Sequence, residues 1–249
     1  MKLVFDIGMF DASDTRYYLE SGCRVVAVEA NPELASRAEQ AFAKEIATKQ
    51  LTVVNRAISD VGGEVDLLLC ADDLGSSTLY RDLIAHRSPS RSVRVPTVSL
   101  TDLIEEHGKP DYLKVDIEGA DRFCVLAVER ERRPTFLSFE VGEDFDELLA
   151  HVVRVGFRQF KLIGQCTFLE LGNERGFGNR ARNAVLRRLG YADPARTLRS
   201  GRWFQRMHSS GPAPWESDGA WRSASALRAQ WERARERRHV TGWYDVHAQ

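Results

Sequence analysis

The sequence predicts an α/β fold, with a doubly wound, mostly parallel sheet and an irregular, partly helical C-terminal extension. Short apolar segments alternate with helical segments over the first 165 residues. The apolar segments are continuous rather than alternating, which is typical of strands that are covered on both faces. Several of them end in an acidic residue or a glycine, at the sheet edge where ligands bind in such folds.

The first 60 residues form a strand–helix–strand–helix–strand pattern. Ser13 or Asp14 is expected to cap the first helix, and Gly22 is expected to end it. Pro32 stands at the start of the second helix, where its fixed φ angle is favourable. The expected elements are strands over 2–8, 23–31 and 51–59 and helices over 13–22 and 32–47.

The rest of the chain continues this pattern, with one interruption. Residues 63–70 and 92–100 are expected to form an added pair of strands, separated by a loop or short helix. Ser99 or Thr101 is expected to cap the following helix and Gly108 to end it. The remaining expected elements are strands over 110–119, 134–142 and 157–165 and helices over 100–108, 120–132 and 144–156.

The chain is predicted to divide into a domain over 1–172 and an extension over 173–249. Gly, Ser, Pro and Arg are frequent in the extension, which indicates loops, and only residues 223–238 have a clear helical pattern. The sequence shows no clear seventh strand, and residues 182–189 are the best candidate for one.

Charge is distributed unevenly. Residues 1–174 contain 20 Lys and Arg against 30 Asp and Glu, whereas residues 175–249 contain 15 Arg against 6 acids. Such asymmetry indicates either an anionic partner or a tail that docks on its own acidic body. We favour docking, because all five tryptophans lie in the tail and side chains of that size are usually buried.

The cysteines, the apolar stretches and the first residues of the chain predict its cellular compartment. The four cysteines are scattered among apolar residues and form no CxxC pair, so we expect buried free thiols. No apolar stretch approaches the roughly 20 residues that span a bilayer, and the first residues do not resemble a signal peptide. A cytoplasmic protein without a membrane partner is the expectation.

Two residues predict a site for a nucleoside-containing cofactor. Gly8 follows the first strand and lets the backbone turn tightly beside a ligand. Glu29 ends the second strand, 21 residues further on, where an acidic side chain can accept hydrogen bonds from ribose hydroxyls. This pattern does not distinguish NAD from S-adenosylmethionine. In the next loop, Ala57 and Ile58 can pack on an adenine face, while Ser59 or Asp60 can bind its edge.

Acidic residues gather at the ends of two later strands. Asp116 and Glu118 follow the fourth strand of the main sheet, and Glu140 ends the fifth, so all three are expected at one rim of the crevice. They can accept a proton from a hydroxyl, bind substrate or hold a divalent metal ion, although no metal ligand set is predicted. Asp121 is expected only to begin a helix, where the helix dipole favours it.

These segments together resemble the FkbM family of S-adenosylmethionine-dependent methyltransferases. The resemblance covers residues 3–165 and rests on these segments: "FDIGMFDASDTRYYLESGCRVVAVEANP", "NRAISD", "SLTDLI", "PDYLKVDIEGAD", "SFEV" and "FKLIGQ". It implies a Rossmann-like methyltransferase sheet, S-adenosylmethionine as methyl donor, and O-methylation of a hydroxyl on a sugar or secondary metabolite. A small-molecule or glycan acceptor is therefore expected, and a nucleic acid is not.

The resemblance also implies roles for single residues. Asp6 and Gly8 belong to the loop on the methionine side, and Glu29 holds the ribose with Asn31 nearby. The adenine lies between Ala57, Ile58 and Ser59, and Asp116 and Glu118 line the reaction centre, with Glu118 as the hypothetical base and Asp116 or Glu140 as the alternatives. The first loop departs from the family pattern: Met9 and Phe10 replace small or polar residues, and Ala12 replaces a glycine.

Three other functions remain as alternatives. An NAD-dependent oxidoreductase can share this fold, but the second and third glycines of GxGxxG are missing and "KVDIEG" has no role there. A nucleic-acid-binding protein or nucleic-acid methyltransferase can use the Arg- and Trp-rich tail to bind phosphates and bases. A non-catalytic partner subunit can use the tail as a protein interface.

Overall fold

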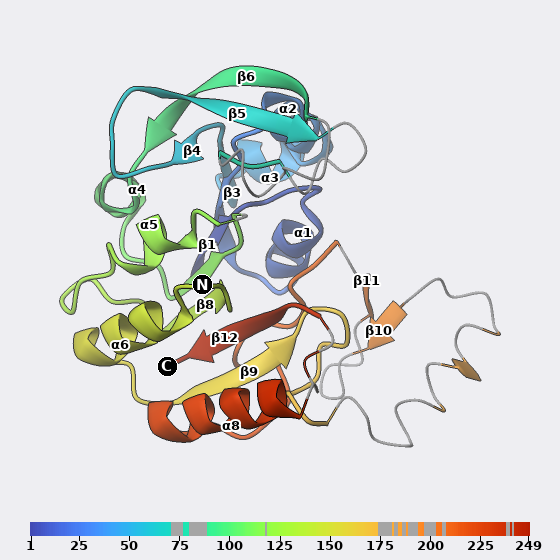
Figure 1. Ribbon diagram of the computed structural model, residues 1–249. Coiled ribbons are helices and arrows are strands. Elements are labelled where there is room, and N and C mark those ends of the chain that lie inside the picture. Colours follow the sequence, from blue (N-terminus) through green and yellow to red (C-terminus); the bar gives the residue numbers. More distant parts are fainter. Residues whose placement is uncertain are drawn as a thin grey trace. The chain divides into compact units, whose positions relative to one another are not determined.

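The computed structural model describes residues 1–70, 77–79, 89–117, 119–173, 208–237, 240 and 242–249, together with 181, 184, 185, 188, 194–196 and 203–205. Two compact units are distinguished (Figure 1). Unit 1 comprises Met1–Thr135 and Gly142–Gly156, and unit 2 comprises Phe136–Val141 and Phe157–Gln249. The division into 1–172 and 173–249 stays a prediction.

Unit 1 is built on four parallel strands in the order β3-β2-β1-β7. The strands are β1 (Leu3–Ile7), β2 (Arg24–Val28), β3 (Leu51–Val54) and β7 (Tyr112–Val115). Every residue of β1 and β7 is buried, as expected for parallel strands whose two faces are covered by helices. The expected α/β class, with a doubly wound and mostly parallel sheet, is confirmed.

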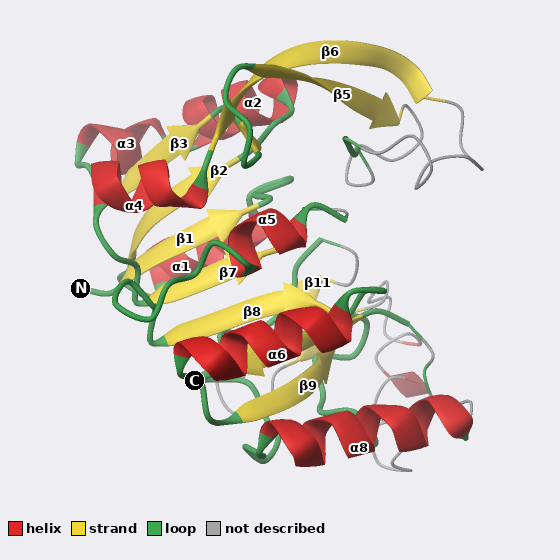
Figure 2. Ribbon diagram, turned by 60° about the vertical axis from the view of Figure 1, so that its left-hand side comes forward, coloured by secondary structure: helices red, strands yellow, loops and turns green. Residues whose placement is uncertain are grey.

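Helices lie on both faces of these strands. The helices of unit 1 are α1 (Ser13–Glu20), α2 (Pro32–Ala41), α3 (Ala43–Ala47), α4 (Leu100–His107), α5 (Asp121–Val125) and α6 (Phe145–Val155). Right-handed crossovers place α1 and α2 on one face and α4 on the other, since the strand order reverses at β1. Figure 2 shows α4 and α5 in front of the strands and α1 and α2 behind them.

Some helix boundaries differ from the prediction. Ser99 caps α4 with a capping box and Gly108 follows its end, both as expected. The residue before α1, however, is Ala12, and neither Ser13 nor Asp14 caps that helix. The expected helix over 120–132 is helical only in α5.

The single helix expected over 32–47 is interrupted at Phe42, whose backbone leaves the helical region with φ −115° and ψ 29°. The Phe42 ring is buried, and the Arg16 guanidinium lies 4.7 Å from its centre. Phe42 follows the buried Ala38 by four residues, so its ring stays on the buried side of α2 despite the break.

The residues that follow α3 provide a test of backbone strain. Lys49 has φ 59°, the left-handed region that glycine adopts at helix ends. Its N–H donates to the Ile46 carbonyl, and the Gln50 N–H donates to the Glu45 carbonyl. Lys49→Gly is expected to raise the free energy of unfolding by about 0.5–1 kcal/mol in urea titrations, because lysine is strained at this position.

Lys44→Gly is the control for this substitution, because Lys44 is exposed and lies within α3. Glycine there is expected to destabilise by about 0.5–1 kcal/mol. Equal effects of both substitutions would contradict the assignment of strain to Lys49.

A small second sheet is inserted between β3 and α4. It contains β4 (Ala57–Ile58), β5 (Glu64–Cys70) and β6 (Pro89–Val98). β5 and β6 pair antiparallel, as expected for the added pair, and they form the long ribbon beside β4 in Figure 1. The predicted strand over 51–59 is thus divided: its first part is β3, and Ala57–Ile58 pairs with β6 instead. Leu67, Leu69 and Val95 pack with Ala57 in a core of their own.

Unit 2 contains a strand that the sequence does not predict. β12 (Tyr244–Ala248) pairs antiparallel with β8 (Phe136–Glu140) on one side and β9 (Phe160–Gly164) on the other. The candidate strand over 182–189 lies mostly outside the described residues. Among the described residues, unit 2 also contains β10 (Pro194–Arg196), β11 (Trp203–Gln205) and the expected helix α8 (Ala224–Glu236).

Polar side chains make β12 hard to recognise as a buried strand. His247 is 1% exposed, and its Nδ1 lies 3.0 Å from the Ser217 hydroxyl oxygen. Burial and the Lys161 ammonium hold the pKa of His247 well below its usual value, so this imidazole is neutral at neutral pH. The Lys161 ammonium donates to the Ser217 carbonyl and lies over the Trp221 ring.

The expectations for cysteines and tryptophans meet different outcomes. All four cysteines are free thiols, and Cys23, Cys70 and Cys124 are buried as expected, while Cys166 is half-buried. The expected burial of the tryptophans is wrong for Trp243, which is 52% exposed. Within the described part of the chain, no helix has the length and apolar character that crossing a membrane requires.

Candidate cofactor site

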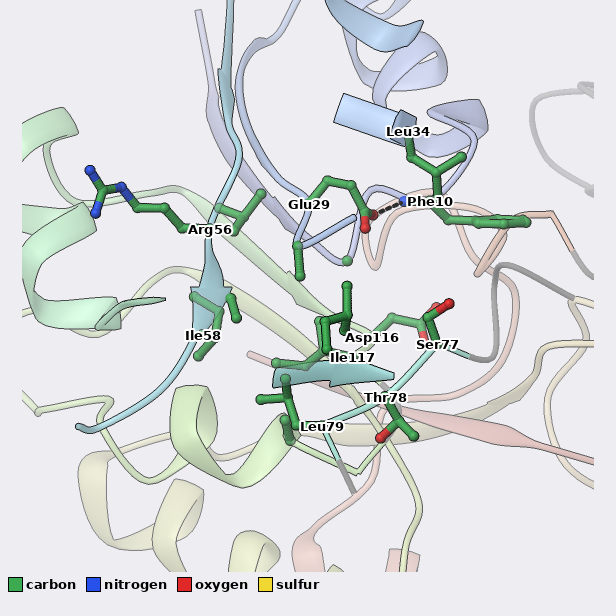
Figure 3. Close-up of a pocket in the computed structure, with 16 residues that line it drawn as sticks. Phe10, Glu29, Leu34, Arg56, Ile58, Ser77, Thr78, Leu79, Asp116 and Ile117 are labelled. Carbon is green, nitrogen blue, oxygen red and sulfur yellow. Dashed lines mark hydrogen bonds between the residues drawn. The ribbon is translucent and has the colours of Figure 1, made fainter. Parts of the chain in front are cut away.

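An open pocket lies in unit 1 at the carboxyl ends of the parallel strands. The empty space within it is about 610 Å³, including space that is open to solvent. Its walls come from the loops after β1, β2 and β7, the start of α2, and the inserted sheet (Figure 3). In a doubly wound sheet this edge, where the strand order reverses, is where ligands bind.

Gly8 forms the tight turn after β1. Its N–H and that of Met9 both donate to the Val28 carbonyl at 3.0 Å, which ties the loop to the end of β2. Gly8 has φ 83°, and a Cβ atom there would lie 1.8 Å from the carbonyl oxygen of Asp116. The loops after β1 and β7 therefore approach each other so closely that only glycine fits.

The same loop has strained backbone at two residues. Phe10 has φ 51° and Ala12 has φ 64°, so two residues with side chains adopt the left-handed region. Each such residue costs roughly 1–2 kcal/mol in backbone strain. The Phe10 side chain lines the pocket, near Leu34 in Figure 3.

Glu29 holds this strained loop and also lines the pocket. Its Oε2 accepts a hydrogen bond from the Phe10 N–H, and its Oε1 accepts one from the Asn31 N–H, both at 2.8 Å. Burial raises the pKa of Glu29 to about 7, against the opposing effect of the two backbone donors and of Lys114. Glu29 therefore changes charge near neutral pH.

Apolar side chains surround this carboxylate. Ala57, Ile58 and Leu67 of the inserted sheet line the pocket, together with Ile117 of the loop after β7. Figure 3 shows Ile58 and Ile117 on the side of the pocket that faces the inserted sheet, with Glu29 between them and the Phe10 loop. This part of the pocket thus combines the Glu29 carboxylate with an apolar slot.

A buried ion cluster lies beside the turn at Gly8. The Lys114 ammonium donates to the Gly8 carbonyl at 2.9 Å and is within 4 Å of three carboxylates. Its distances to Asp6 Oδ1, Asp14 Oδ2 and Asp116 Oδ2 are 3.1, 3.6 and 3.7 Å. Burial alone lowers the pKa of Lys114, but the three carboxylates outweigh it and raise that pKa well above its usual value. Lys114 is therefore a permanent cation.

The structure brings together five of the predicted site residues: Gly8, Glu29, Ala57, Ile58 and Asp116 all line the pocket. Their roles toward a ligand stay predictions.

Three other predicted site residues do not line it. Asp6 is fully buried and accepts a 2.6 Å hydrogen bond from the Thr15 hydroxyl. The Asn31 side-chain oxygen accepts a hydrogen bond from the Glu33 N–H and so caps α2. The Ser59 hydroxyl oxygen accepts a hydrogen bond from the Val61 N–H. These three side chains therefore lie behind the residues that line the pocket and not at its surface.

Two of the predicted catalytic residues have no described place in this pocket. Glu118 lies outside the described residues, and Glu140 ends β8 in unit 2. Asp121 begins α5 as expected, and its carboxylate accepts from the Ile117 N–H, which orders the loop next to Asp116.

Several lining residues were missed by reasoning from sequence. Arg56 extends along the rim and donates to the Thr97 carbonyl, and Ser77, Thr78 and Leu79 form one wall. Thr78 exchanges two backbone hydrogen bonds with Leu68 of β5. This pairing holds the segment beside β5, and no local sequence signal predicts it. Leu34 offered a weak signal, as an apolar residue in the first turn of the helix that follows Glu29.

A metal ion has no evident ligand set here. Among the residues that the structure describes, no group of three or more His, Cys, Asp or Glu side chains is arranged to hold one. The three aspartates around Lys114 come closest, and the ammonium supplies the positive charge at their centre.

Comparison with known proteins identifies the family of the chain. The model of a family described as the methyltransferase FkbM domain matches residues 6–159. No curated protein matches the chain. Among solved structures, precorrin-6y C5,15-methyltransferase from Geobacter metallireducens is 13% identical, with a TM-score of 0.38; 66% of this chain and 68% of that chain are covered. That structural similarity is too slight to indicate a function.

Proposed function

The chain belongs to the FkbM methyltransferase family, and from this premise we propose that its pocket binds S-adenosylmethionine for the O-methylation of a sugar or secondary metabolite. The observation that carries the proposal is Glu29, a carboxylate at the end of β2 between the Phe10 loop and an apolar slot. The acceptor in this proposal is a small molecule or a glycan.

The chemistry of the pocket fits the nucleoside part of S-adenosylmethionine. A ribose presents two neighbouring hydroxyl donors, and a carboxylate has about four lone-pair positions. Glu29 uses one position on each oxygen for the Phe10 and Asn31 N–H groups, which leaves one on each for a hydroxyl. Ala57, Ile58 and Ile117 offer an apolar surface for a flat base.

The residues near Asp116 carry the proposed chemistry. S-adenosylmethionine supplies a methyl group that is already activated on a sulfonium. The protein must hold the acceptor oxygen in line with that methyl group and remove the hydroxyl proton as the new O–CH₃ bond forms. Asp116 lines the pocket with a side chain that is 31% exposed, so it can accept that proton. Glu118, the base hypothesised from the sequence, lies outside the described residues and stays a prediction, and Asp116 and Glu140 are its alternatives.

The proposal is tested by isothermal titration of the protein with S-adenosylmethionine and, separately, with NAD. We expect micromolar binding of S-adenosylmethionine and no binding of NAD, because the pyrophosphate-binding glycines of NAD sites are missing from the Gly8 loop. Binding of NAD alone, or of neither compound, would overturn it.

The O-methylation step is tested separately, by incubating matched acceptor analogues that carry a hydroxyl, an amine or a thiol at the same position. Mass spectrometry is expected to detect methyl transfer to the hydroxyl compounds, with and without Mg²⁺. Transfer to amines alone would contradict O-methylation.

A further inference from the structure

We propose that Lys114 is a positioning residue that fixes the loop after β1 against the loop after β7 and thereby shapes the cofactor pocket. This inference rests on the proposed function for the identity of the ligand. It goes beyond that function because neither the family match nor the pattern of strand-end acids assigns Lys114 any role.

The first observation is that one ammonium group contacts both loops. Lys114 Nζ donates to the Gly8 carbonyl at 2.9 Å and lies 3.7 Å from Asp116 Oδ2. Gly8 and Asp116 both line the pocket, whereas Lys114 does not. Lys114 therefore acts on the pocket through these residues and not by touching a ligand.

The second observation is that the loops after β1 and β7 are in direct contact, with no space between them. The Asp116 N–H donates to the Ile7 carbonyl at 3.0 Å, and any Cβ on Gly8 would overlap the Asp116 carbonyl oxygen. A shift of either loop thus moves the other. The Gly8 loop continues to Phe10, whose N–H binds Glu29, so a shift there reaches the centre of the pocket.

The third observation is electrostatic. The Lys114 side chain is 3% exposed, and a buried ammonium is costly unless charges and acceptors surround it. The carboxylates of Asp6 in β1 and Asp14 in α1 compensate the charge on one side, and the carboxylate of Asp116 compensates it on the side of the pocket. Removal of the ammonium leaves these carboxylates to repel one another, which displaces Asp116, the most exposed of them, toward solvent.

The test uses a double variant that keeps the net charge of the cluster. Lys114→Met alone leaves uncompensated carboxylates and is expected to unfold at lower denaturant concentration. Lys114→Met with Asp6→Asn removes one charge of each sign. It also removes two opposite influences on the pKa of Glu29, which Lys114 lowers and Asp6 raises. Any remaining loss of affinity in the folded double variant is then attributed to a changed position of the two loops and not to a changed net charge of the cluster.

We expect the folded double variant to bind S-adenosylmethionine roughly tenfold more weakly than the wild type at pH 8.5, which is above the wild-type pKa of Glu29, about 7. Hydrogen–deuterium exchange is expected to become faster at the amides of residues 8–10 and 116–117, but not in the middle of β2. Wild-type affinity together with wild-type exchange rates would overturn the proposal.

Lys161→Met is the matched control. Lys161 is equally buried and its ammonium also binds a backbone carbonyl, that of Ser217 in unit 2. This variant is expected to lose stability without a change in exchange at residues 8–10. An equal change there would show that loss of any buried lysine loosens the loop, and would overturn a specific role for Lys114.

The two proposals fail in different ways. If the wild type does not bind S-adenosylmethionine, the proposed function is wrong, whereas the exchange rates at residues 8–10 and 116–117 still decide the role of Lys114. If the wild type binds and the double variant binds and exchanges identically, only the role of Lys114 is wrong.

Discussion

Replacing Gly8 with alanine is expected to lower the free energy of unfolding by about 3 kcal/mol or more and to abolish binding of S-adenosylmethionine. The new methyl carbon would lie 1.8 Å from the Asp116 carbonyl oxygen and 2.9 Å from the Ile117 side chain. Backbone cannot yield as a flexible side chain does, so the loops must separate. Urea unfolding and isothermal titration measure the two effects.

Gly22→Ala separates steric overlap from backbone strain. Gly22 has φ +78°, close to the +83° of Gly8, but a Cβ atom there would meet no described atom within 4 Å beyond its own chain neighbours. Alanine there is expected to cost only about 1 kcal/mol and to leave ligand binding unchanged. If the two alanine variants lose the same stability, contact between the Gly8 and Asp116 loops is not what requires glycine.

The parts of the fold that were predictable are those whose signal is local. Mostly apolar runs identify β1, β2 and β7, because strands covered on both faces bury the side chains of both faces. Ser99 followed by Asp102 identifies the start of α4, because both groups of a capping box lie within four residues. Gly8 and Glu29 indicate the pocket because each follows a recognisable strand, and the carboxyl ends of parallel strands lie at one edge of the sheet.

The parts that were missed depend on contacts between distant segments. β12 contains Asp245 and His247, both buried, and such residues do not mark a strand in isolation. Its position follows from pairing with two strands that are 80 or more residues earlier in the chain. The left-handed backbone at Phe10 is equally non-local, because its N–H is held by the Glu29 carboxylate.

Glu29→Gln is expected to weaken binding of S-adenosylmethionine about a hundredfold at pH 8 and to remove its pH dependence. The pKa of Glu29 in the free protein is about 7, raised chiefly by burial. Ribose hydroxyls donate best to the ionised carboxylate, so wild-type affinity should rise as pH increases from 5.5 to 8 and level off above pH 7. Isothermal titration from pH 5.5 to 8 measures the loss of affinity in the variant and the pH dependence of the wild type. Because the ligand prefers the ionised carboxylate, binding to the wild type at pH 7 should release protons.

The same group predicts an opposite trend in stability. Since the folded pKa of Glu29 lies above its ordinary value of 4.5, the folded state holds the proton more tightly than the unfolded chain does. Its contribution to the stability of the free protein is therefore largest below pH 4.5 and is lost as pH rises through about 7. Ligand affinity and the stability of the free protein should thus change in opposite directions over this interval.

Glu33→Gln is the control for both trends, because Glu33 lies in the first turn of α2, pairs with Arg91 and does not line the pocket. This variant should keep the wild-type pH dependence of binding. A wild-type affinity that is constant from pH 5.5 to 8, or a pH dependence that survives Glu29→Gln, would show that Glu29 does not bind the ligand. Because the Phe10 N–H also loses a charged acceptor in Glu29→Gln, faster exchange of that amide should accompany the loss of affinity.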